Sequence, residues 1–147
     1  MILKLIQKFM PAKKMIDMFT LKVTSNQSIE LIVANVQEAC DKYGFALLQT
    51  YKYHEIVESK GFPIKRKVFI YEICKAKTAA LMLTDNANFS IFMPCKLAIY
   101  EENNKTIIST MNMGMMLQAV RSNKELYDDA SSLFSKLESL MNYLSTC

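Results

Sequence analysis

The stretch "YEICKAKTAALMLTDNANFSIFMPCKLAIYEE", residues 71–102, decides the predicted fold. It begins inside "KVFIYEI" (67–73), whose β-branched and aromatic residues predict a strand. The helix formers of "KAKTAALML" (75–83) follow, and the polar cluster "TDNAN" (84–88) predicts a turn after them. A strand and a helix therefore meet at Cys74.

The second half of the stretch predicts more strands. We expect "FSIFM" (89–93) to form a strand that ends at Pro94, because proline lacks the backbone N–H of a strand ladder. "CKLAIYEE" (95–102) and "TIISTM" (106–111) alternate around two asparagines, which predicts a β-hairpin. Cys95 therefore begins a strand, as Cys74 ends one.

The flanking sequence extends the same alternation of strands and helices. Apolar residues alternate with polar ones over 19–24, which predicts a strand. Ser28 begins a helix that ends at Gly44, and "FALLQTY" (45–51) predicts the next strand. Residues 53–60 predict a short helix.

The chain closes with a long amphipathic helix. Its apolar stripe recurs at helical spacing: Leu126, Ala130, Leu133, Phe134, Leu137, Leu140, Met141 and Leu144. The pattern as a whole indicates the α+β class, an antiparallel sheet backed by helices.

Length and composition indicate one domain. A chain of 147 residues with 51% hydrophobic residues and three prolines can bury one cooperative core, which we assign to residues 17–147. Residues 1–16 form a separate amphipathic leader helix, with Ile2, Leu5, Ile6 and Phe9 at helical spacing and Pro11 as its end. Docking of this leader on its own domain or on a second subunit is favoured over attachment to a membrane surface, because so short a helix has little apolar area.

Charge and targeting signals set further expectations. The net charge of +4 is modest, and "KRK" (65–67) is interpreted as a solvated strand start, so a nucleic-acid partner is not favoured. Lys4, Gln7 and Lys8 interrupt the apolar residues of the leader, and no cleavage site follows, so we expect a cytoplasmic protein.

The four cysteines are expected to be free thiols, because no CxxC pair is present. Cys40 lies on the apolar face of a predicted helix and Cys147 is the last residue, which leaves Cys74 and Cys95 as site candidates. A thiol at the start of a helix is near the positive end of the helix dipole, which favours the thiolate of Cys74. Cys95 shares one strand face with Leu97, Ile99 and Glu101.

Two interpretations of these cysteines remain open. Small, inert, buried thiols are the simpler one, and a single site containing both Cys74 and Cys95 is the functional hypothesis. Catalysis by Cys74 would need a base or cation nearby, for which Lys75, Glu72 and His54 are the candidates.

Other motifs point to chemistry less strongly. "MNMGMM" (111–116) raises the question of Cu(I), which thioethers and thiolates select, but packing is the favoured interpretation of these methionines. A lone His54 seldom makes a metal site, and the carboxylates of Glu101 and Glu102 at a turn are usually solvated. No phosphate-binding glycine loop, GxSxG or HExxH is present. No cofactor is predicted.

Three segments, "YGF", "FIYEIC" and "FMPCKLAIYEENNKTIISTMN", resemble family 302 of the domains of unknown function, an uncharacterised bacterial and archaeal family, over residues 18–145. Cys74-Lys75-Ala76, Pro94-Cys95 and Glu101 stand at the places of its motifs, although Lys75 replaces the usual asparagine. The resemblance implies a single-copy fold similar to that of the TATA-box-binding protein, often dimeric. It implies no activity.

We therefore predict a homodimeric, non-enzymatic module that binds a small ligand, or binds through its thiols or a metal, in redox or sulfur-related physiology. The alternatives are a cysteine-dependent enzyme and a structural homodimer that uses the leader and the last helix as an interface with another protein.

Overall fold

A computed structural model describes residues 1–147, apart from the side chains of Ile6 and Gln7. Five strands form one antiparallel sheet in the order β1-β5-β4-β3-β2. In chain order the elements are α1 (Ile2–Phe9), α2 (Ala12–Phe19), β1 (Thr20–Ser25), α3 (Ile29–Ala34), α4 (Val36–Tyr43), β2 (Ala46–Lys52), α5 (Tyr53–Ser59), β3 (Val68–Cys74), α6 (Ala76–Asp85), η1 (Ala87–Phe92), β4 (Cys95–Glu102), β5 (Lys105–Met111), α7 (Gly114–Ala119) and α8 (Lys124–Thr146).

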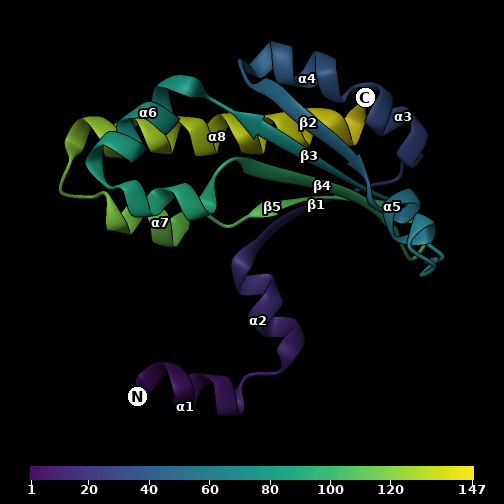
Figure 1. The fold of residues 1–147 in the computed structure, drawn as a ribbon, viewed down its shortest axis with the longest axis horizontal. Helices are drawn as coiled ribbons and strands as arrows, with labels where there is room; N and C mark the ends of the chain where they lie inside the picture. The colour runs from purple at the N-terminus through teal and green to yellow at the C-terminus, as the bar shows by residue number, and fades with distance from the viewer.

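One face of the sheet is covered by helices, and the core lies between the two layers. Figure 1 shows α8 running along the sheet, with α3 and α4 at the end nearest the C-terminus. Every apolar position predicted for the last helix is buried except Phe134, which is half-buried. The α+β class, the antiparallel sheet and the long last helix are confirmed; likeness to the TATA-box-binding-protein fold stays a prediction.

Several local predictions are confirmed in detail. The side chain of Ser28 accepts a hydrogen bond from the N–H of Leu31, and Gly44 ends α4 with a positive φ of 74°. Asn103 and Asn104 both have positive φ, as the tight turn between β4 and β5 requires.

The helix predicted from Ser28 to Gly44 is divided into α3 and α4. Asn35 separates them, and its side chain donates to the carbonyl of Leu31 at 2.8 Å. Asparagine side chains compete with the backbone for such hydrogen bonds, which explains the break.

The strand predicted over residues 89–93 is wrong, because η1 is a 3₁₀ helix. The side chain of Asn86 accepts from the N–H of Asn88 at 2.9 Å, and this turn starts the helix. Phe89 is buried but Ile91 is 80% exposed, so the apolar alternation does not mark a sheet face here.

The predicted end of the leader helix at Pro11 is confirmed, because α1 ends at Phe9. A second helix, α2, follows Pro11 and continues to Phe19, three residues beyond the predicted end of the leader at residue 16. Below we call residues 1–19 the N-terminal arm. Figure 1 shows the arm standing away from the sheet, and most of its described large apolar side chains are exposed. The side chain of Ile6, which was part of the predicted stripe, lies outside the described residues.

Removing a core side chain of α8 should destabilise the domain strongly. Leu137 is fully buried, so Leu137→Ala should lower the free energy of unfolding by roughly 2–5 kcal/mol. Ile91→Ala, which truncates an exposed side chain, should change it by less than about 0.5 kcal/mol. Chemical denaturation measures both, and equal effects would contradict the layered core.

Candidate functional site

A pocket of about 290 Å³ lies at the end of the sheet where β3 ends and β4 begins. Figure 1 shows α6 and α7 gathered at this end. The residues that line it are Leu48, Ile73, Cys74, Lys75, Thr78, Ala79, Met82, Phe92, Met93, Pro94, Cys95, Met113, Met116 and Leu133. Most of these are apolar, and the pocket is therefore a site for apolar groups with a few polar contacts.

Both cysteines singled out from the sequence line this pocket. Cys74 is the last residue of β3 and Cys95 the first of β4. In the ladder between these strands Ile73 pairs with Cys95, which places Cys74 one residue beyond that pair. The antiparallel register thus brings together two thiols that lie far apart along the chain.

Burial raises the pKa of the Cys95 thiol, and the charge of a Cys74 thiolate would raise it further. A raised pKa keeps Cys95 protonated at neutral pH, where it is a weak nucleophile. Cys95 is therefore better suited to contact a ligand than to attack one.

The pocket is rich in sulfur. Six of its fourteen lining residues carry sulfur, whereas the whole chain has eleven methionines and four cysteines among 147 residues. The methionines come from separate elements: Met82 from α6, Met93 from the segment after η1, and Met113 and Met116 from the start of α7. The enrichment at one place is more than scattered gap-filling would give.

Lys75 lies at the border between this pocket and a second, polar hollow of about 350 Å³. Its ammonium is 5.2 Å from the centre of the Phe45 ring. Burial lowers the pKa of Lys75, and the charge of Lys136, which lines the same hollow, lowers it further. Two cations thus lie near each other beside an apolar pocket.

Asp129 balances part of that positive charge. It accepts a hydrogen bond of 2.5 Å from the hydroxyl of Thr78, and the ammonium of Lys77 is 3.3 Å from its other oxygen. The hydrogen bond from Thr78 is the main reason that the pKa of Asp129 is lowered. Thr78 is buried and lines the pocket, so it joins the polar hollow to the apolar one.

Glu72 is not directed to Cys95. Its carboxylate pairs with the ammonium of Lys96 at 2.9 Å, and the two residues oppose each other in the β3–β4 ladder. They alternate with Ile73 and Cys95 and therefore lie on the other face of the sheet.

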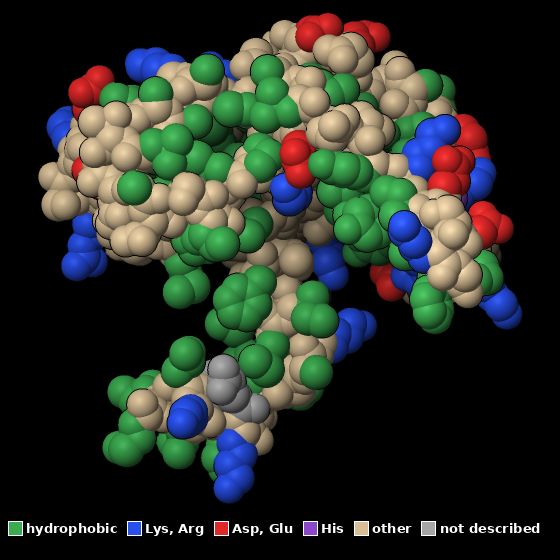
Figure 2. All heavy atoms as spheres, viewed as in Figure 1, with side chains coloured by type: hydrophobic (Ala, Val, Ile, Leu, Met, Phe, Trp, Pro, Cys, Tyr) green, Lys and Arg blue, Asp and Glu red, His purple; other side chains and the backbone are tan. Residues whose placement is uncertain are grey.

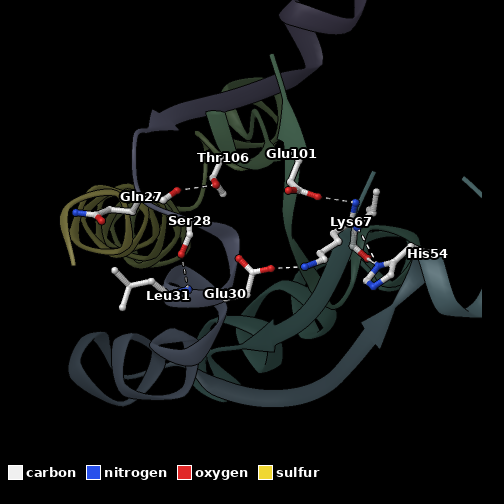
Figure 3. A network of polar contacts seen from close by, with 9 residues as sticks. Gln27, Ser28, Glu30, Leu31, His54, Lys67, Glu101 and Thr106 are labelled. Atoms are coloured by element: carbon white, nitrogen blue, oxygen red, sulfur yellow. Dashed lines mark hydrogen bonds and ion pairs between the residues drawn. The ribbon is translucent and has the colours of Figure 1, made fainter. Parts of the chain in front are cut away.

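Glu101 and His54 lie at the far end of the sheet. Figure 3 shows Glu101 bonded to Lys67, and His54 bonded to the backbone of the next residue along the chain, Val68. The carboxylate of Glu101 accepts from the N–H of Lys67 at 3.0 Å, and Nδ1 of His54 accepts from the N–H of Val68 at 3.0 Å. Lys67 also pairs with Glu30. Since β3 begins at Val68 and ends at Cys74, this network is a strand's length from the pocket.

Sequence reasoning missed part of the pocket. The methionines of "MNMGMM" were noticed, but nothing in their spacing connects them to the cysteines. Leu48 lies at an irregularity in the pairing of β2 with β3, and Met93 and Phe92 belong to the segment predicted as a strand. Within the described residues, no cluster of three or more histidine, cysteine, aspartate or glutamate side chains is placed to hold a metal.

Residues 21–144 match the family described as "Domain of unknown function DUF302". The crystal structure of an uncharacterized conserved DUF302 protein from Bacillus stearothermophilus is similar, with 26% sequence identity and a TM-score of 0.72. The similarity covers 85% of this chain and 97% of that one. No curated protein matches.

The raised pKa of Cys95 predicts how its alkylation depends on pH. Iodoacetamide reacts with the thiolate, so the rate at Cys95 should keep rising with pH past the pKa of an ordinary thiol, about 8.5. Cys40, which is buried and has a pKa of about 11, should stay unmodified in the folded protein. Peptide mass spectrometry after timed alkylation measures each cysteine.

The same cysteines in urea-unfolded protein are the control, since each thiol then serves as its own reference. A plateau of the Cys95 rate at or below about pH 8.5 in the folded protein would contradict the prediction.

Proposed function

Since this chain belongs to the DUF302 family, we propose from the geometry of its own pocket that it is a binding module for a small apolar molecule with an anionic end. The apolar part would lie against the thiols of Cys74 and Cys95, and the anionic end would meet Lys75. The observation that carries the proposal is the apolar pocket with Lys75 at its border.

The size of the pocket limits the ligand. A volume of about 290 Å³ is near the lower end of small-molecule sites, so a short chain or a single ring fits and a large cofactor does not. The lining from Met82, Met113 and Met116 is flexible and polarizable, which suits ligands of irregular shape.

Two neighbouring lysines support the anionic end of the proposed ligand. Lys75 and Lys136 repel each other, and this repulsion contributes to the lowered pKa of Lys75. An anion between them would relieve the repulsion and gain charge-assisted hydrogen bonds. Asp129 does not fill this role fully, because Thr78 and Lys77 already occupy its two oxygens.

Binding is better supported than catalysis. A cysteine-dependent enzyme needs a base beside its nucleophile. Glu72 is paired with Lys96, and His54 is held by Val68 at the far end of the strand. Lys75 is the candidate that remains beside the thiols, and this proposal assigns its charge to the anionic end of the ligand. We propose that the protein works in a reducing compartment such as the cytoplasm, where its four cysteines would be free thiols.

Hexanoate and hexanol are suitable probes of this proposal. Titration of hexanoate into protein labelled at the methionine methyl groups should shift the NMR signals of Met82, Met93, Met113 and Met116. Ala79→Phe, which fills the pocket, should abolish the shifts. Ala80→Phe places the same ring on the exposed side of α6 and should leave them unchanged.

The variant Lys75→Met tests the anionic end of the ligand separately from its apolar part. It should weaken hexanoate binding by roughly tenfold, the effect of losing one charged hydrogen bond, and leave hexanol binding unchanged. Shifts that survive Ala79→Phe would refute binding in this pocket, and equal losses for both probes would refute the anionic end.

A soft metal ion is a second candidate ligand, favoured by the six sulfur side chains at the pocket. Thiolates and thioethers select Cu(I), and Cys74 and Cys95 with Met113 or Met116 offer such a donor set. Binding of Cu(I) would be the chemical basis of the redox or sulfur-related role that the sequence predicts.

Competition with a Cu(I) chelator under anaerobic conditions tests this candidate. Wild-type protein should retain Cu(I), and Cys74→Ser or Cys95→Ser should lower the affinity by at least about tenfold, as loss of a ligand does. Cys147→Ser, which removes a thiol outside the pocket, is the matched control. Equal affinities in all variants would eliminate the site.

A further inference from the structure

The N-terminal arm exposes apolar side chains to an extent that a folded domain seldom tolerates. Figure 2 shows green side chains along both of its helices, with lysines among them. Phe9 is 79% exposed and Ile2 is 77% exposed. The other exposed large apolar residues of the arm are Met1, Leu3, Leu5, Ile16, Met18 and Phe19.

Both helices of the arm are amphipathic. In α1, Ile2, Leu5 and Phe9 follow helical spacing on one side, and Lys4 and Lys8 lie four residues apart on the opposite side. In α2, Ile16 and Phe19 lie three residues apart, while Lys13, Lys14 and Asp17 occupy the polar side. Each helix therefore presents an apolar face bordered by lysines.

Positive charge is concentrated in the arm. Residues 1–19 hold four lysines and one aspartate, a net charge of +3, out of +4 for the whole chain. The remaining residues, 20–147, are close to neutral at +1. A partner that complements the arm must therefore be both apolar and negatively charged, and the body of a second copy lacks that charge.

We propose that the arm binds the surface of an anionic lipid bilayer. Its apolar faces enter the boundary between headgroups and acyl chains, and Lys4, Lys8, Lys13 and Lys14 lie among the anionic headgroups. No helix among the described residues has the length and apolar character to cross a bilayer. Because both helices of the arm are amphipathic, each would lie in the plane of the surface. The two short helices together supply the apolar area that one alone would lack.

The arm is fixed to the end of the sheet that holds the pocket. The carbonyl of Phe19 accepts from the N–H of Asn112 at 2.8 Å, and Asn112 directly precedes the pocket residue Met113. Thr20 pairs with Met111 at the same end of the sheet. Docking of the arm would thus bring the pocket near the bilayer, a consequence that rests on the proposed function, whereas the docking itself does not.

Co-sedimentation of the full chain with vesicles tests the proposal. The protein should bind vesicles that contain phosphatidylglycerol and phosphatidylcholine, bind vesicles of phosphatidylcholine alone more weakly, and lose affinity as salt rises. The double variant Leu5→Asp, Phe9→Asp should lower the apparent affinity by at least roughly tenfold. Ile91→Asp, at an exposed site of η1, is the matched control and should bind as wild type does.

Neutralising the arm tests the charge. Replacing its four lysines by glutamine should lower affinity for the anionic vesicles by at least roughly tenfold and flatten the salt dependence. The same change at four exposed lysines of the body should have little effect: Lys52, Lys60, Lys65 and Lys124.

Three outcomes would overturn the proposal. They are no binding to either vesicle, binding that the arm variants leave unchanged, and a dimer in light scattering that the Leu5→Asp, Phe9→Asp variant converts to a monomer. The last would show that a second copy covers the arm. Hexanoate binding by the arm variants reports on the pocket separately, so the two proposals fail independently.

Discussion

The antiparallel pairing of β3 with β4 is the constraint on which the rest of the structure depends. It sets Ile73 opposite Cys95 and Tyr71 opposite Leu97, and these residues lie on the face that the helices cover. Side chains alternate between the two faces of a strand, so a shift of one residue in either strand would turn Glu72 or Lys96 into the core. The register of β3 with β4 therefore determines both the buried face of the sheet and the place where Cys74 and Cys95 come together.

The two ends of this sheet have different chemistry. At the end where β3 begins, Glu101 and His54 accept hydrogen bonds from the backbone of Lys67 and Val68, and the ammonium of Lys67 pairs with Glu30. These polar groups therefore stabilise the fold. At the other end the strands are followed by α6, η1 and α7, and a pocket of about 290 Å³ lies among them. The space that remains is lined with methionine, whose flexible side chain fits such irregular sites.

The arm and the pocket are two apolar surfaces of different shape that the folded protein does not fill with its own core side chains. The pocket is concave and small, so it selects a ligand by shape and by the cation at its border. The arm is exposed, so a partner would bind it through a large apolar area and a charge opposite to that of its lysines. Their common position at one end of the sheet follows from β1, whose first residue pairs with the last residue of β5.

The sequence by itself determined the class of fold, because alternation with period two and the stripe from Leu126 to Leu144 each bury one face of an element. It also identified Cys74 and Cys95, and it located Cys74 before a helix and Cys95 at a strand start. It could not connect them with Met113 or Lys136, because that neighbourhood depends on strand register and on the crossing of α6, α7 and α8. It placed Ile91 in a strand, since local pattern does not show how Asn86 will direct the backbone. Tertiary structure alone decided that Glu101 and His54 lie at the far end of the sheet from the thiols and that Glu72 pairs with Lys96, for the direction of a side chain is fixed by pairing partners that are distant along the chain.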